Sequence, residues 1–282
     1  MVKANRNPPP SWQQYAVVLG AIAGFLVFVF WLLGLLVDNL VWLIPSVVEQ
    51  QLGRLIVPNF EQQAKPSPTQ DILNAMLDRL EANLPERQPD RSYRLLYIPD
   101  STINAIALPS DVIVVYRGLV SKAESENELM MILGHELGHF ANRDHLRGIT
   151  RALFLQILLS IVFGDAGDMG RATGGIIEAL ANSSYSQAQE LQADEFGITL
   201  LQRTYSHVAG ATDFFERISQ LGGSPVPFLS THPHPSDRVA RLQEIIRTRG
   251  YQIGQKTPLP DTLRTDQPVQ SKQLLGEFPC PT

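Results

Sequence analysis

The sequence of 282 residues contains a single cysteine, Cys280. One thiol cannot form an intrachain disulfide, and it excludes a zinc finger built on pairs of cysteines. Basic residues are not in excess either, since 23 lysines and arginines stand against 28 aspartates and glutamates and give a net charge of −5. Without a basic surface, nucleic acid is not an expected partner. Hydrophobic residues make up 44% of the chain, which excludes wholesale disorder.

Long uncharged hydrophobic runs are also scarce, and the longest is Tyr15–Val37. As a helix this run measures roughly 35 Å, enough to cross a hydrocarbon core of about 30 Å with some tilt. Trp12 before it and Trp42 after it suit the membrane interfaces. A signal peptide has a shorter apolar region and a small-residue cleavage site, and no such site follows here. The run therefore predicts an uncleaved membrane anchor rather than a signal peptide or a buried core helix.

The orientation of this anchor follows from the basic residues beside it. Lys3 and Arg6 precede the run, and the first basic residue after it is Arg54. Positive charge remains on the cytoplasmic side. We therefore expect a single-pass protein with its N-terminus in the cytoplasm and the rest of the chain across the membrane.

Three β-rich runs lie in the middle of the chain, at Tyr93–Ile98, Thr102–Leu108 and Val112–Tyr116. Turns at Pro99-Asp100 and Pro109-Ser110 separate them. They predict a small sheet ahead of the first long helix of the domain.

That long helix is predicted to open at Ser125, because Ser125 and Glu128 fit a capping box and apolar residues at helical spacing follow. Further helices are predicted at about Ala188–Arg203 and Asp237–Arg249. The apolar run Ala152–Phe163 is too short to span a membrane and is followed by a glycine-rich loop, 164–175. The predicted organisation is a cytoplasmic segment (1–14), a transmembrane anchor (15–37), juxtamembrane helices and linker (38–92), a catalytic domain (93–250) and an extended, proline-containing tail (251–282).

The long helix contains the segment HELGH at 135–139. His135 and His139 are four residues apart, so both imidazoles project from one helix face and can share a metal ion. Glu136 lies beside the first histidine, where it can act as general base on the attacking water and later protonate the leaving amine. Zinc suits this set when one further protein ligand is added.

The sequence offers two candidates for that further ligand. His145 lies six residues after His139, as in HExxHxxGxxH, but Asn142 stands where that pattern has glycine. Glu190 is the rival, and on a helix it shares a face with Asp194, which could orient a ligand histidine. An ordinary solvated acidic face is the alternative explanation of that pair.

Three motifs in order resemble the HtpX and CAAX-prenyl-protease family of membrane zinc metallopeptidases. They are HELGHF at 135–140, ELQAD at 190–194, and Thr231-His232-Pro233 followed by Arg238. Residues 104–109 and 118–120 also look like the strand region that leads into the family's motif helix. The family often has Ser-Arg shortly upstream of the ligand glutamate, where this chain has Ser186-Gln187.

The resemblance implies a zincin-like α+β domain, with a small mixed sheet packed on the motif helix and a mostly helical remainder. It implies one zinc ion per chain. The expected roles are His135, His139 and Glu190 as ligands, Glu136 as base, Asp194 behind the ligands, and His232 as a transition-state or gating group. His232 is expected in an extended proline-rich loop, His234 in a loop, and His145 at a helix end facing the negative dipole.

The function expected is that of a membrane-anchored zinc endopeptidase acting on polypeptides. The resemblance suggests unfolded or misassembled envelope proteins as substrates, and a bacterial inner membrane with the catalytic domain outside the cytoplasm. One alternative is a metal-binding chaperone or scaffold whose protease site is latent, with His232 occupying the open position. Another is a metzincin that uses His145.

Overall fold

The computed structural model describes residues 11–85, 91–151, 174–175, 184–220 and 226–265. The chain divides into two units, Met1–Ile44 and Pro45–Thr282, and each is described by itself.

The first unit contains helix α1 (Trp12–Leu40) and a short 3-10 turn (Val41–Leu43). Among the described residues, α1 is the one helix long and apolar enough to cross a membrane, and no part of its most apolar stretch, Trp12–Val29, is buried. Large side chains such as Phe25 and Trp31 are exposed along it. The apolar run Tyr15–Val37 predicted from the sequence lies within this helix. Its length and apolar surface suit a lipid environment better than water.

The second unit is built on a three-stranded sheet with the order β1-β3-β2. Strand β1 (Arg94–Ile98) is parallel to β3 (Val112–Tyr116), and β2 (Ala105–Leu108) is antiparallel to it. The prediction of a small mixed sheet is confirmed. Strand β2 begins later than predicted, because the backbone N–H of Thr102 donates to the Asp100 side chain in a turn.

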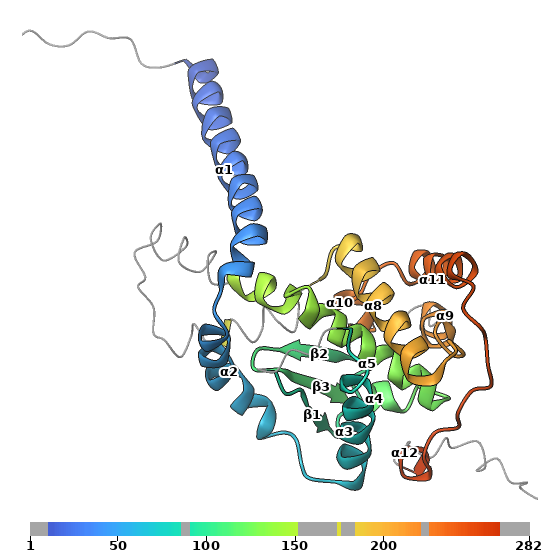
Figure 1. Ribbon diagram of the computed structural model, residues 1–282. Helices are drawn as coiled ribbons and strands as arrows, with labels where there is room; N and C mark the ends of the chain where they lie inside the picture. The colour runs from blue at the N-terminus through green and yellow to red at the C-terminus, as the bar shows by residue number, and fades with distance from the viewer. Residues whose placement is uncertain (1–10, 86–90, 152–173, 176–183, 221–225, 266–282) are drawn as a thin grey trace, which may run out of the picture. The chain divides into compact units, whose positions relative to one another are not determined.

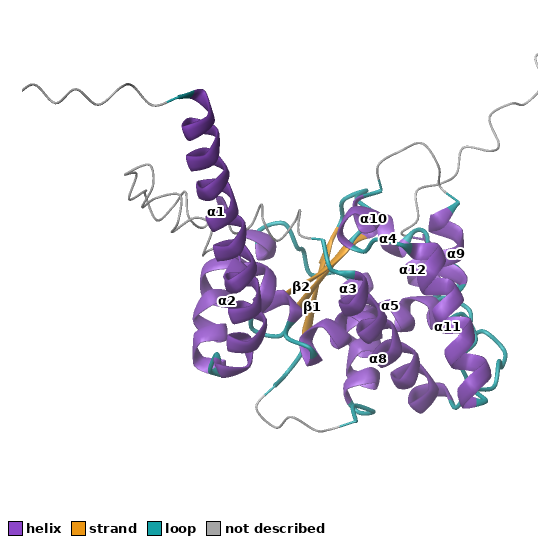
Figure 2. Ribbon diagram, turned by 90° about the horizontal axis from the view of Figure 1, so that it is seen from above, coloured by secondary structure: helices purple, strands orange, loops and turns teal. Residues whose placement is uncertain are grey.

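Helices cover both faces of this sheet (Figures 1 and 2). Successive strand residues face opposite sides, so Leu95 and Ile113 join the main core while Leu96 and Val114 join a second cluster with Ile56 of α2. The helices are α2 (Ser46–Glu61), α3 (Pro68–Glu81), α4 (Arg117–Val120), α5 (Glu126–Ala141), α8 (Gln187–Tyr205), α9 (Asp213–Ser219), α10 (Pro227–Thr231), α11 (Pro235–Arg249) and α12 (Asp261–Thr265).

Helix α5 is the predicted motif helix, and it packs directly on α8. The Ser125 hydroxyl caps it by accepting from the Glu128 N–H at 3.3 Å, while the Glu128 carboxylate accepts from the Glu124 N–H rather than completing the capping box at Ser125. A Cβ atom added at Gly138 would lie 2.8 Å from Cα of Ala193 on α8. Glycine therefore lets the two backbones approach closely, which brings the side chains at the start of α8 beside the face of α5 that bears the histidines.

Prolines begin two of the later helices. The segment around Pro227 was expected to be extended, but Pro227–Thr231 forms helix α10, because proline is tolerated in the first helical turn. Pro235 likewise occupies the first turn of α11, which starts two residues earlier than predicted. Helix α8 confirms the helix predicted at 188–203 and extends it at both ends.

Two other predictions concern segments that lie wholly or partly outside the described residues. The apolar run 152–163 and most of the glycine-rich loop 164–175 lie outside the described residues. The tail expected to be extended contains the short helix α12, and Pro258 just before it forms an isolated antiparallel bridge with Ser125 at the start of α5. Part of the tail is therefore attached to the N-terminal end of the motif helix.

Candidate metal centre

The two motif histidines lie on one face of α5, and both are fully buried. Their Nε2 atoms are 3.1 Å apart. Two atoms bound to the same tetrahedral zinc at about 2.0–2.1 Å each lie about 3.3 Å apart. His135 and His139 are therefore already spaced as two ligands of one ion.

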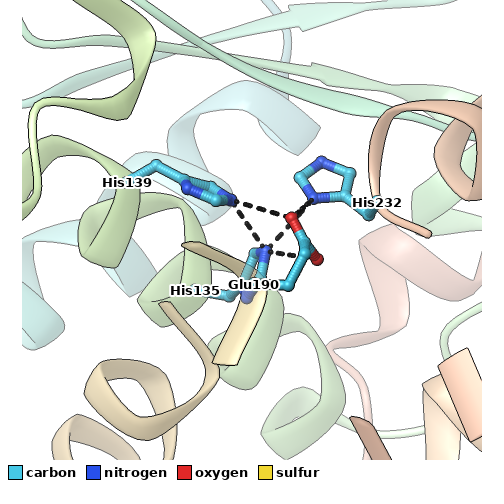
Figure 3. Close-up of side chains that lie close together, drawn as sticks. All are labelled: His135, His139, Glu190 and His232. Atoms are coloured by element: carbon cyan, nitrogen blue, oxygen red, sulfur yellow. Dashed lines mark hydrogen bonds and ion pairs between the residues drawn. The ribbon is translucent and has the colours of Figure 1, made fainter. Parts of the chain in front are cut away.

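The first turn of α8 brings a carboxylate to the same point (Figure 3). Glu190 Oε1 lies 3.5 Å from Nε2 of His139, and Oε2 lies 3.7 Å from Nε2 of His135. Ser186 and Gln189 form a full capping box at the start of the helix, which fixes the turn that holds Glu190. Glu190 and Asp194 are both buried. The alternative explanation of this pair, an ordinary solvated acidic face, is therefore wrong.

His232 reaches the same cluster from the residue that follows α10 (Figure 3). Its Nδ1 lies 3.0 Å from Oε1 of Glu190 and 3.2 Å from Nε2 of His135. Its ring is stacked on Phe228, with centroids 4.4 Å apart. Donor atoms of His135, His139, Glu190 and His232 all lie within 4.8 Å of one another.

Glu136 is buried beside these donors but does not share in their hydrogen bonds. Neither of its carboxylate oxygens has a hydrogen-bond partner among the described residues, and Nε2 of His232 lies 3.7 Å from Oε1. A buried carboxylate without a hydrogen bond is costly in a folded protein. The Glu136 carboxylate thus keeps both oxygens available to accept a hydrogen bond from a water or a substrate group.

Each motif histidine is held from behind by a carboxylate. Nδ1 of His135 lies 2.9 Å from Oδ1 of Asp194, and Nδ1 of His139 lies 2.9 Å from Oδ2 of Asp144. A proton on each Nδ1 makes these hydrogen bonds and leaves the Nε2 lone pair for a metal. Asp194 was predicted for this position from the resemblance, whereas Asp144 was not predicted, although it stands only five residues after His139.

Asp144 reaches back to His139 because the chain reverses direction after α5. Arg143 adopts a left-handed conformation with φ of 55°. The Asp144 side chain is also held by Arg147, 2.6 Å away, and by Gln189 of the α8 capping box, 2.7 Å away. The turn after α5 and the start of α8 are therefore joined through one carboxylate.

Arg238 of α11 lies completely buried behind the cluster. Its Nε and Nη2 atoms donate to the two oxygens of Asp194 at 2.8 and 2.6 Å, and Nη1 lies 2.6 Å from Oε2 of Glu190. The guanidinium also stands over the ring of Phe215 at 4.3 Å. Arg238 supplies positive charge at this site, whereas Gln187, which stands where the resembling family often has arginine, is exposed.

His145 does not belong to the cluster. Residues 144–151 are helical, so His145 lies in the first turn of a new helix and not at the end of α5. Its Nε2 pairs with Oε1 of Glu49 at 2.9 Å. The expected contact with a negative helix end is therefore wrong, and the metzincin arrangement loses its ligand. Asn142 also keeps a right-handed conformation, with φ of −89°.

The two remaining histidines, His207 and His234, are not part of the cluster. His234 is exposed and left-handed before α11, in agreement with the expected loop position. His207 accepts a hydrogen bond from the N–H of Ala209.

The charges around the cluster favour a cation. Burial raises the pKa of Asp194, but Arg238 and His135 outweigh that effect and lower it to about 2. Burial likewise opposes ionisation of Glu190, yet the neighbouring positive charges hold its pKa well below the usual value. Burial lowers the pKa of His139, but Asp144 and Glu190 outweigh it and raise the pKa to about 9. The surrounding carboxylates therefore stabilise positive charge at His139, and a divalent cation bound to Nε2 would supply it.

Comparison with known proteins supports a metallopeptidase. The pattern of Peptidase family M48 matches residues 67–246. The chain is 30% identical over 154 residues to the mitochondrial metalloendopeptidase OMA1 of Arabidopsis thaliana, which covers 54% of this chain and 31% of that protein. It is 29% identical over 153 residues to the metalloprotease LoiP of Escherichia coli, which covers 52% of this chain and 60% of LoiP. It is 26% identical over 226 residues to the beta-barrel assembly-enhancing protease of Yersinia pestis, which covers 73% of this chain and 43% of that protein. The chain thus spans between 31% and 60% of the length of these relatives.

The geometry of Arg238 gives a prediction for stability. Arg238→Met should lower the free energy of unfolding by about 3–5 kcal/mol, because it leaves Asp194 buried without its charge partner. Arg241→Met, on the exposed side of the same helix, serves as the control and should change stability by less than about 0.5 kcal/mol. Denaturant unfolding of both variants, with zinc content measured in parallel, gives the comparison. Equal stabilities would show that the buried pairs contribute nothing.

Proposed function

The chain belongs to Peptidase family M48, and we propose that it is a zinc-dependent endopeptidase held at a membrane by α1 and acting on polypeptides. The observation that carries the proposal is the Glu136 carboxylate, which is buried without a hydrogen bond next to a cluster of four converging donor residues. A purely structural metal site has no use for a costly, unsatisfied carboxylate beside the ligands.

We assign zinc binding to His135, His139 and Glu190, one ion per chain. Zinc supplies a Lewis acid that polarises the scissile carbonyl and makes water a nucleophile at neutral pH. Asp194 and Asp144 keep the ligand rings in the required tautomer and orientation.

Glu136 is the proton carrier in this proposal. It takes the proton of the attacking water and delivers it to the departing amine, so that the C–N bond breaks to give a carboxylate and an amine. Tyr185 lies over the ring of His139, with centroids 3.8 Å apart, and covers that side of the site. Burial of the histidines and carboxylates of the cluster keeps bulk water from screening these charges.

The substrates proposed are unfolded or misassembled proteins of the cell envelope. The relatives from Escherichia coli and Yersinia pestis support this, since one is named a metalloprotease and the other a beta-barrel assembly-enhancing protease. The rival function, a chaperone or scaffold with a latent site, shares the binding of unfolded chains but not their cleavage. Digestion of casein with and without a zinc chelator separates the two.

We also propose that the catalytic unit lies outside the cytoplasm, with α1 as a single span in a bacterial inner membrane. Lys3 and Arg6 precede the helix, and Arg54 is the first basic residue after it. A reporter that is active only after export, fused after residue 60, should therefore be active. The same reporter fused before residue 11 is the control and should be silent. Activity of a cytoplasmic reporter at position 60 would reverse the topology.

The role of Glu136 predicts a separation of binding from catalysis. Glu136→Gln should keep the fold and the zinc but lower the rate of casein cleavage by about 10²–10⁴, because only the general base is removed. Glu244→Gln, a partly exposed glutamate on α11, is the matched control and should cleave at the rate of the unmodified protein. Metal content by mass spectrometry and cleavage rate are measured on the same samples. A rate close to that of the control would rule out the mechanism.

We further propose that His232 gates the site. The Nδ1 atom lies among the donors, at hydrogen-bond distance from Glu190 and His135, which is the place of a fourth ligand in the resting state. A histidine held there excludes the water that Glu136 must activate. The competing role is a hydrogen bond from His232 to the developing oxyanion, for which the stacking on Phe228 would also provide a fixed ring.

These two roles predict opposite effects of His232→Ala. Under gating the basal rate of casein cleavage rises, since water gains access to the site. Under oxyanion stabilisation the rate falls by about 10²–10³. His234→Ala, two residues away and exposed, controls for changes in the loop. An unchanged rate would reject both roles.

A further inference from the structure

A second group of ionisable side chains lies near the metal cluster and involves none of its proposed ligands. Glu49 of α2 is 3% exposed and His145 is 1% exposed. Their side chains meet at 2.9 Å, and the other oxygen of Glu49 accepts from Nη2 of Arg91 at 3.1 Å. Arg91 in turn donates to Asp111 at 2.6 Å, in the turn between β2 and β3. Glu49 and His145 are buried, while Arg91 and Asp111 are partly buried. Burying ionisable groups is costly, so this group calls for an explanation beyond packing.

The group touches the metal site through two consecutive residues. Asp144 holds the ring of His139, and His145, the next residue, is held by Glu49. The ring of His145 also packs against Phe140, with centroids 4.7 Å apart, and Phe140 follows His139 on α5. The backbone between Asp144 and His145 is therefore fixed from one side by the ligand and from the other by α2.

Helix α2 is itself held firmly on the sheet. A Cβ atom at Gly53 would lie 1.9 Å from Oγ of Ser110, so glycine is needed for the close approach of α2 to the β2–β3 turn. Ile56 and Phe60 lie fully or almost fully buried in the cluster on that sheet face. The contact from Glu49 to His145 thus starts from a rigid element, as a group that orients a metal ligand requires.

We infer that Glu49 is a positioning residue for the metal centre: by holding His145, it fixes Asp144 and hence the ring of His139. The inference rests on the proposed zinc binding by His135, His139 and Glu190. It connects the site to α2, the first helix of the catalytic unit, which begins at Ser46, with residues 41–45 separating it from the end of α1 at Leu40.

The test compares zinc affinity in full-length Glu49→Ala and Glu61→Ala, purified in detergent. Glu61 is the matched control, because it lies on the same helix in an exposed ion pair with Arg94. Groups that orient metal ligands typically contribute 10–100-fold to metal affinity, and for Glu49, one step further from the metal, we expect a loss of about tenfold. Competition with a chromophoric chelator measures the affinity, and Glu49→Gln, which keeps the shape and one acceptor, should recover part of it.

A double-mutant cycle separates positioning from a general loss of stability. In the Asp144→Asn background, Glu49→Ala should weaken zinc binding by less than about twofold, because the group through which it acts is already impaired. The gain in melting temperature on adding zinc should also shrink in Glu49→Ala but not in Glu61→Ala. A structural role would instead lower the melting temperature equally with and without zinc.

The outcomes are distinct. If the unmodified protein binds no zinc, the proposed function itself fails. If it binds zinc and Glu49→Ala matches Glu61→Ala in affinity, only the inference about Glu49 is overturned. Independent, multiplying losses in the double variant would likewise overturn it.

Discussion

The contact on which the whole site depends is the close approach of α5 and α8. Gly134, Gly138 and Gly197 have no side chain at the crossing, and a Cβ atom on Gly197 would lie 2.9 Å from the backbone nitrogen of His135. Side chains at these positions would collide with the facing helix, so the glycines are what allow Glu190 to reach the two histidines across the crossing. The metal centre is therefore a consequence of backbone geometry before it is a matter of ligand chemistry.

Close packing also brings several carboxylates together, and positive charges in the rest of the site balance them. Glu136, Glu190, Asp194 and Asp144 are all buried within a small volume, and four carboxylates repel one another where water cannot screen them. Arg238 and Arg147 balance two of these charges. A divalent cation at the histidines balances the other two. Neighbouring charges also explain the two shifted pKa values: Arg238 lowers the pKa of Asp194, and Asp144 and Glu190 raise the pKa of His139.

Much of this could be predicted from the sequence, because the signals are local. The spacing of His135 and His139 places them on one helix face whatever the fold, and strand, turn and cap signals gave the sheet and the main helices. Glu190 and Asp194 needed the resemblance, since an acidic pair four residues apart has no unique meaning alone. Asp144, Glu49 and the buried state of Arg238 could not be found this way. Their roles depend on a left-handed turn at Arg143 and on contacts between residues far apart in the sequence.

The two motif histidines are not supported in the same way, and this difference has consequences. His135 is held by Asp194 of α8, which is locked by Arg238 of α11, so its orientation depends on packing among the helices of the domain. His139 is held by Asp144, in a turn whose next residue is fastened to α2. Any displacement of α2 along the sheet would therefore disturb one ligand and leave the other in place. Because α2 is held firmly on the sheet, both histidines are supported by fixed elements, but the two supports are separate from one another.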